Sequence, residues 1–372
     1  MNEADLPFGG IHQHVVKPVH TLNVTDRNRW NLRGLVKTCK IERTWFMTRC
    51  GADACETETR NDVSALEFRP NGSLARHKHL NPDGSEHTTV YEYNQADLLT
   101  IVRAEHSSGD VHLQLYEYDQ AGRLARLIMR SGAGERVTES YEYDQHGRKS
   151  KIIHVDQLGV RPNAWRVEGT DAFYSAPDAA LVTTHYNERD QPAELLFHDS
   201  TGNLVSRVEF RYDGNLNLVE EEQTTFADML PPEATAQMNA AQREAVRHLF
   251  AAARRSHRYD EHNRRIETRN QMGLLSEEHM SMFYNDRGDM IGQIVEAQDR
   301  EFGMDDEGQL SPAPATERSR WSEARFTYEY DVQGNWVSKT SEGRNRPDAD
   351  FTVHSIERRV NSYFDLNAPA VC

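Results

Sequence analysis

Cysteine, histidine and carboxylate residues could do chemistry here, but their spacing does not match a catalytic or metal centre. Cys39, Cys50 and Cys55 are 11 and 5 positions apart, which fits no compact zinc motif. His77 and His79 are two positions apart, so both side chains would lie on one face of a strand. This spacing is compatible with metal binding but common by chance. We therefore expect neither a metal centre nor a cofactor.

Motifs of nucleophilic and hydrolytic catalysis are missing from the sequence. There is no Gly-x-Ser-x-Gly elbow, no glycine-rich phosphate loop and no His-Glu-x-x-His helix. Carboxylate pairs of the kind that glycosidases use are so abundant that none stands out. The sequence predicts that the protein is not an enzyme. The alternative is a hydrolase or lyase site in one of the insertions described below.

Aromatic and charged residues in long insertions are the candidates for ligand binding. Trp165, Arg166, Asp171 and Tyr174 lie in a loop-like stretch, and Trp321 ends a second insertion. Aromatic rings beside polar groups on a loop can form a platform for a sugar or a peptide. For the two tryptophans, the alternative is ordinary packing under a loop.

A repeated unit must position these candidates. Nine aromatic anchors recur at intervals of 25 or 26 residues, except for three longer intervals of 43, 47 and 46. A fixed period of this length is typical of a repeat architecture. The anchors are Phe68, Tyr93, Tyr118, Tyr143, Tyr186, Tyr212, Tyr259, Tyr284 and Tyr330.

Each anchor ends a predicted strand and is followed by a turn. Apolar and polar residues alternate up to the anchor, as in a strand with one packed face. A residue that tolerates φ > 0 follows four positions later, usually glycine, with Leu216 as the exception, where Asp213-Gly214-Asn215 is expected to close a tighter turn. The glycines at this position are Gly72, Gly122, Gly147, Gly288 and Gly334, and Asp97, Asp190 and Asn263 replace glycine in three copies.

A second turn in each unit makes the unit a β-hairpin. Nine units give about eighteen antiparallel strands in a meander, and so long a sheet must curl. The sequence therefore predicts an all-β fold, a hairpin meander forming a curved or spiralling sheet (a partial shell or solenoid), with one inserted amphipathic helix.

The repeat resembles a known family. The run Tyr116-Glu-Tyr-Asp-Gln-Ala-Gly-Arg-Leu124 is similar to the YD repeat of the Rhs (rearrangement hotspot) and teneurin proteins, and runs from Tyr141 and Tyr328 match as well. The resemblance covers roughly residues 60 to 340. It implies a bacterial protein, a strip of sheet wound into a shell, and sugar binding. The chain would be a short member without the core-associated segment or the toxin domain of longer members.

The long intervals mark insertions at about residues 160–180, 230–256 and 302–321, and the second reads as a helix over 233–255. They enter at the same phase of the unit, so we expect them along one edge of the meander. The remaining organisation is an irregular segment 1–28, a repeat domain 29–350 with N-terminal cap strands, and a C-terminal cap strand and tail 351–372.

Charge and hydropathy limit the partners. With 59 acidic and 43 basic residues the net charge is −16, which repels phosphate backbones and anionic membranes. No signal peptide and no apolar run of membrane-spanning length is evident. We expect no nucleic-acid partner, no membrane, and a cytoplasmic location or export by a signal-independent system.

Together these features predict a non-catalytic binding or scaffold protein that presents its insertions along one edge to a carbohydrate or protein partner. One alternative is an accessory or shell-like component of a polymorphic toxin or secretion system that encloses a polypeptide. The other is the hydrolase or lyase named above.

Overall fold

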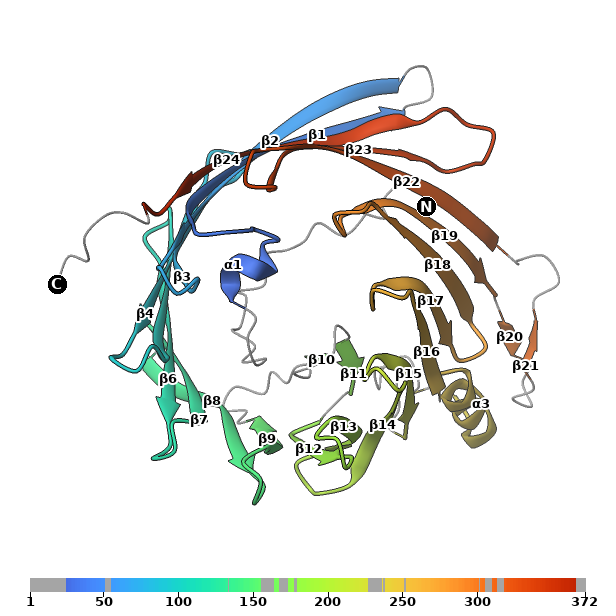
Figure 1. Ribbon diagram of the computed structural model, residues 1–372. Helices are drawn as coiled ribbons and strands as arrows, with labels where there is room; N and C mark the ends of the chain where they lie inside the picture. The colour runs from blue at the N-terminus through green and yellow to red at the C-terminus, as the bar shows by residue number, and fades with distance from the viewer. Residues whose placement is uncertain are drawn as a thin grey trace.

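The wall of the protein is one closed antiparallel barrel of 20 strands (Figure 1). The computed structural model describes residues 25–50, 55–132, 134–154, 164–166, 173–176, 179–226, 236, 238–250, 252–300, 302–304, 310–312 and 318–365. Each wall strand pairs with its neighbours in chain order, and the last pairs with the first. The wall strands are β1 (Val36–Cys50), β2 (Cys55–Phe68), β3 (Leu74–Leu80), β4 (Glu86–Tyr93), β5 (Leu99–His106), β6 (Val111–Tyr118), β7 (Leu124–Ser131), β8 (Gly134–Tyr143), β9 (Lys149–His154), β12 (Leu181–Tyr186), β13 (Pro192–His198), β14 (Leu204–Tyr212), β15 (Leu218–Thr225), β16 (Ala252–Tyr259), β17 (Arg265–Met272), β18 (Ser276–Tyr284), β19 (Met290–Asp299), β22 (Arg318–Tyr330), β23 (Trp336–Arg344) and β24 (Thr352–Tyr363).

Short elements accompany the wall. Helix α1 (Asp26–Arg29) and the hairpin of β10 (Ala164–Arg166) and β11 (Phe173–Ser175) lie inside the ring in Figure 1. Helix α3 (Ala240–Phe250), within the predicted helical insertion, leads into β16. Strands β20 (Phe302–Met304) and β21 (Leu310–Pro312) form a separate hairpin. In the described part of the chain, no helix has the length and apolar character needed to span a membrane.

The predicted antiparallel meander is confirmed, but the predicted partial shell or solenoid is wrong because the sheet closes. Strands β1 and β24 pair from Val36 opposite Tyr363 to Trp45 opposite Ser355. The stretches predicted as separate caps are therefore wall strands that pair with each other. Pairing the two ends satisfies the backbone groups that an open strip would leave exposed at both edges.

Tyrosine hydroxyls tie each repeat to the one before it. The Tyr118 hydroxyl donates to the backbone oxygen of Leu99 at 2.7 Å, and Tyr143 donates to Leu124 at 2.8 Å. The guanidinium of Arg123, in the turn of one repeat, stacks 4.5 Å from the ring centre of Tyr143 in the next. A contact between repeats therefore favours tyrosine at the anchor position, in addition to its strand propensity.

The turns follow one plan. The carboxylate of Asp119 accepts hydrogen bonds from the backbone N–H groups of Ala121 and Arg123, both at 2.9 Å, and Gly122 has φ +75°. The tighter turn predicted before Leu216 is not formed. Leu216 itself adopts the left-handed conformation, with φ +69°. Its N–H bonds the Asp213 carbonyl at 3.2 Å, as in the other turns.

The tyrosine face of the sheet points into the barrel, because Tyr91 and Tyr93 line a pocket together with residues of α1. Helix α1 lies inside the ring (Figure 1). Twenty strands spaced about 4.8 Å apart give a backbone diameter of roughly 30 Å before tilt widens it, too wide for side chains alone to fill. Buried residues accordingly form three separate clusters on this wall, around Leu66, Val102 and Phe197. The barrel has a lumen.

Outward positions, which alternate with the inward tyrosines, carry many ion pairs. Ion pairs at outward positions are favourable where the wall contacts water or a polar partner. Placing them in contact with hydrocarbon costs free energy. Examples, with distances of 2.5 to 2.9 Å, are Glu117–Arg126, Glu142–Lys151, Arg211–Glu220, Arg258–Glu267 and Glu323–Arg344.

Asn335 offers a test of the closing seam. Its amide nitrogen donates to the carbonyl of Arg33 (3.0 Å) and to Tyr363 (2.9 Å), and its oxygen accepts from the Arg33 N–H (2.5 Å). We expect N335A to lower the free energy of unfolding by about 2–3 kcal/mol, because several buried groups lose partners. Asn203 occupies the same turn position and bonds only within its own turn. In denaturant titrations N203A should cost less than about 1 kcal/mol, and equal losses would contradict this role.

Leu216 offers a test of turn strain. We expect L216G to raise the free energy of unfolding by about 1 kcal/mol, because glycine adopts φ > 0 without the steric cost that leucine meets. N263G at the equivalent turn position, where Asn263 has φ +58°, is the matched control. Asparagine tolerates this conformation, so its replacement should change stability by only a few tenths of a kcal/mol. Thermal and denaturant unfolding measure both, and no gain for L216G would refute the strain.

Candidate functional site

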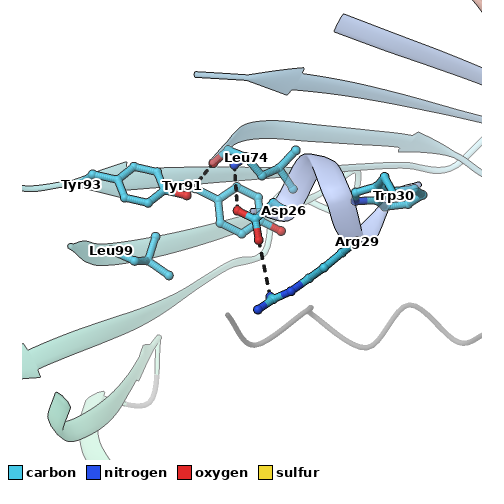
Figure 2. A pocket seen from close by; sticks show the side chains of 7 residues that line it. All are labelled: Asp26, Arg29, Trp30, Leu74, Tyr91, Tyr93 and Leu99. Carbon is cyan, nitrogen blue, oxygen red and sulfur yellow. Dashed lines mark hydrogen bonds and ion pairs between the residues drawn. The ribbon is translucent and has the colours of Figure 1, made fainter. Parts of the chain in front are cut away.

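A pocket opens on the inner wall between α1 and strands β3 to β5 (Figure 2). Its volume is about 200 Å³ and its walls are mainly apolar. An apolar cavity of this size can accept a ring-sized group. The lining residues are Asp26, Arg29, Trp30, Leu74, Tyr91, Tyr93 and Leu99.

One edge of the pocket is polar. Asp26 accepts a hydrogen bond from the Leu74 N–H at 2.8 Å and pairs with Arg29 at 3.5 Å (Figure 2). The Tyr93 hydroxyl donates to the Leu74 carbonyl at 2.8 Å. Burial, and then the charge of Asp26, raise the pKa of Tyr91 and of Tyr93. Both phenols therefore stay neutral at physiological pH, and the ion pair is the charged feature of the pocket.

Helix α1 is held over the pocket by contacts from distant parts of the chain. The N–H of Arg27 donates to the Gly72 carbonyl at 3.1 Å, and its guanidinium donates to the Arg69 carbonyl at 2.8 Å. From β24, Arg359 donates to the Trp30 carbonyl at 3.1 Å. The short helix could not hold its shape alone, so these contacts position Trp30 and Arg29.

A second polar site lies on the inner wall where the β10–β11 hairpin docks. Tyr174, on β11, is 3% exposed and packs edge-to-face on Phe210 at 5.9 Å between ring centres. Its hydroxyl hydrogen-bonds the carboxylate of Glu221. Glu221 also pairs with Arg255 at 2.6 Å and lies 3.4 Å from His257.

Glu221 is charged in the folded protein. Burial opposes the charged form, but hydrogen bonds from His257 and Tyr174 and the guanidinium of Arg255 outweigh it. They hold the pKa of Glu221 below its usual range. A buried carboxylate with three hydrogen-bond donors can hold the β10–β11 hairpin against the wall. This structural role accounts for Glu221 without a catalytic one.

The predicted ligand-binding residues do not come together. Tyr174 is buried inside the barrel. Trp321 lies on β22, where it pairs with Glu296 and occupies an outward position. Trp165 and Arg166 form β10 beside β11, with only their backbone described, and Asp171 lies outside the described residues.

The three insertions do leave the same rim of the barrel, because each joins an odd-numbered wall strand to the next in the strand order. They do not present a shared outer surface, since the β10–β11 hairpin turns into the lumen (Figure 1). Sequence reasoning missed the pocket altogether. Asp26, Arg29 and Trp30 lie in and beside a segment predicted to be irregular, and only Thr25, which caps α1, signalled a helix start.

Histidine, cysteine and carboxylate side chains do not form a metal centre in the described part of the chain. No group of three or more of them is arranged to hold a metal ion there.

Glu221 gives a pH-dependent prediction. We expect E221Q to lower the free energy of unfolding at pH 7 by about 1–3 kcal/mol, because buried donors lose a charged acceptor. Since folding lowers the pKa of Glu221, its stabilisation is complete above the unfolded value of about 4.3 and disappears as pH falls through the folded value. Denaturant titrations from pH 7 to pH 3 should therefore show the two proteins converging.

The control is E220Q, one residue along the strand. Glu220 lies on the outer face and pairs with Arg211 and Arg254 at 2.7 and 2.6 Å. The E220Q variant should lose less than about 1 kcal/mol and leave the docking of β11 unchanged in hydrogen exchange. Equal loss of β11 protection in both variants would remove the latch role of Glu221.

No protein-family model and no curated protein matches the sequence. Similar solved structures include a porin-like protein from Bacteroides uniformis, 9% identical with a TM-score of 0.32, over 87% of this chain and 96% of that chain. Another is Salmonella typhi OmpF in complex with daunomycin, 8% identical with a TM-score of 0.25, over 88% of this chain and 98% of that chain. At these TM-scores the likeness carries no argument about what the barrel does.

The predicted functions are corrected nonetheless. A scaffold that displays its insertions along one edge and a shell of a toxin system were both predicted for a curved or spiralling sheet, which the closed wall replaces. The cytoplasmic location and the absence of a membrane were predicted for an open or spiralling sheet. Because the wall is a closed barrel, both predictions are withdrawn.

Proposed function

We propose that this protein is a barrel that binds a guest inside its lumen, with the pocket beneath α1 as the main subsite. The closed ring of 20 strands supports a lumen, and the apolar and aromatic inner wall supports a binding surface. Concave, largely apolar sites with a few placed polar groups are where small molecules bind. The proposal assigns no catalytic step.

The pocket beneath α1 is the observation that carries the proposal. It combines a ring-sized volume of about 200 Å³ with Trp30 and Tyr91 as aromatic walls. The Asp26–Arg29 pair marks one edge, so a guest with a polar substituent can exchange contacts with that pair. The favoured guest chemistry is an aromatic or alicyclic ring with a polar or charged substituent.

The relation of the hairpin unit to the YD repeat is also a proposal. It is supported by the Asp-x-x-Gly turn and the tyrosine bond to the preceding unit, which recur around the wall. No family model supports it.

Ring binding can be tested with three probes that differ in charge: benzyl alcohol, phenylacetate and phenethylamine. We expect at least one to bind the purified protein in ligand-observed NMR and calorimetry. Leu99, 2% exposed, lines the pocket, and L99F should weaken this binding at least tenfold by filling the cavity. Leu124 occupies the same position in the next repeat, away from α1, so L124F is the matched control.

Two outcomes would overturn the proposal. The first is that no probe binds, or that L99F and L124F bind alike. The second is a stable single-channel conductance in planar bilayers that persists in L99F without probe binding, which would replace guest binding by passage through the lumen.

A further inference from the structure

Five histidines gather on the inner face of β3 to β6, and the proposed function does not use them. His79 is paired with His87 across β3 and β4, and His87 with His106 across β4 and β5. The ring centres of His87 and His106 are 4.5 Å apart, and those of His106 and His112 are 5.6 Å apart. His77, the fifth, lies 6.4 Å from His79 between ring centres.

His77 is the member of this group that touches α1. The ring of Trp30 meets it edge-to-face at 5.8 Å between centres. Its Nε2 is buried and has no hydrogen-bond partner among the described residues. Burial, and then the charge of His79, lower the pKa of His77 to about 4. The docked structure therefore accommodates the neutral ring and penalises the protonated one.

The charged groups near His77 do not stabilise its protonated form. Asp62 on β2 faces His79, but it already accepts from Trp45 at 2.9 Å and pairs with Arg43 on β1 at 3.4 Å. His79 is bonded to the Ser64 hydroxyl at 2.9 Å. From β4, His87 adds like charge when protonated.

Helix α1 itself brings three charged groups to this part of the wall, Asp26, Arg27 and Arg29. The guanidinium of Arg27 donates to the Arg69 carbonyl at 2.8 Å. Asp26 is bound to Arg29 and to the backbone of Leu74. The two arginines carry the same sign of charge as a protonated His77, and the one carboxylate, Asp26, is already paired.

We propose that His77 makes the docking of α1 on the inner wall acid-sensitive, so that the pocket beneath α1 loosens as the pH falls. This inference rests on the proposed function only for the identity of the pocket as a binding site. Protonation favours the state in which His77 meets water, and that state requires Trp30 to move away. Acid would then release a guest without unfolding the wall.

The pH dependence of α1 docking follows from the pKa of His77, because the state in which His77 has the higher pKa gains stability as the pH falls. Burial in the folded protein, to which Trp30 of α1 contributes, lowers the pKa of His77 from an ordinary value of about 6.5 to about 4. The part of this shift that docking causes weakens docking as the pH falls from about 6.5 to about 4. The upper limit, reached if docking causes the whole shift, is a roughly 30-fold fall in the docking equilibrium between pH 7.5 and pH 5. Burial also lowers the pKa of His79, which adds in the same direction.

Hydrogen exchange on the ligand-free protein tests this. The N–H groups of Trp30 and Leu32 are bonded to Asp26 and Arg27 in the docked segment, at 3.2 and 3.1 Å. After correction for intrinsic exchange rates, their protection should fall between pH 7.5 and pH 5, by at most about 30-fold. Protection of β13 should not change, which separates local undocking from global unfolding.

The variants H77F and H77Q remove the titrating group, and either one suffices if the other fails to fold. Both should abolish the pH-dependent loss of protection in residues 26–32. The control is H262Q, in an exposed turn, which should behave like the unmodified protein. The proposal is overturned if α1 protection is independent of pH, or if both H77 variants keep the full loss.

Failure of this inference and failure of the proposed function give different results. Probe binding at pH 7.5 with pH-independent protection of α1 would leave the binding barrel and remove the acid response. Loss of α1 protection at pH 5 without any probe binding would leave the acid response and remove the binding function.

Discussion

The bond from an anchor tyrosine hydroxyl to the backbone of the preceding repeat, which seven of the nine anchors make, is the interaction on which this structure depends. A strand pair alone fixes the distance to its neighbour, but not the tilt of one hairpin against the next. The bonds from Tyr118 to Leu99 and from Tyr284 to Arg265, at 2.7 and 2.8 Å, span the same 19 residues in different parts of the ring. A contact repeated from one hairpin to the next favours a similar rotation at most steps, and a sheet that turns steadily can close on itself.

Closure at 20 strands determines what the inside must contain. A ring this wide cannot be filled by side chains, so apolar burial is local and depends on inserted segments. Helix α1 covers one cluster and the β10–β11 hairpin covers another, where Tyr174 and Ala176 are almost fully buried. The sequence suggests that all insertions are outer loops, but the insertion that contains the β10–β11 hairpin contributes buried residues inside the barrel.

The sequence predicts what is local and repeated. The contacts of Asp119 and Gly122 lie within one turn, so the hairpins and the antiparallel meander could be predicted from the sequence. The predicted count of about eighteen strands is lower than the 20 of the wall, because the stretches predicted as caps are wall strands. Closure was not accessible, because the pairing of Val36 with Tyr363 joins residues from opposite ends of the chain and has no local signature. The pocket was missed for the same reason. Leu74 and Trp30 meet only because distant contacts, such as that from Arg359, fix α1.

Helix α1 and the β10–β11 hairpin both dock on the inner wall through apolar contacts combined with polar ones. Apolar contact supplies attraction without a fixed geometry, whereas a buried charged or titrating group sets the position and makes it conditional on protonation. Glu221 must stay charged to hold Tyr174, while His77 must stay neutral beneath Trp30. The wall carries its own continuous hydrogen-bond ladder and needs neither condition. The contents of the lumen can therefore respond to pH while the barrel around them remains folded.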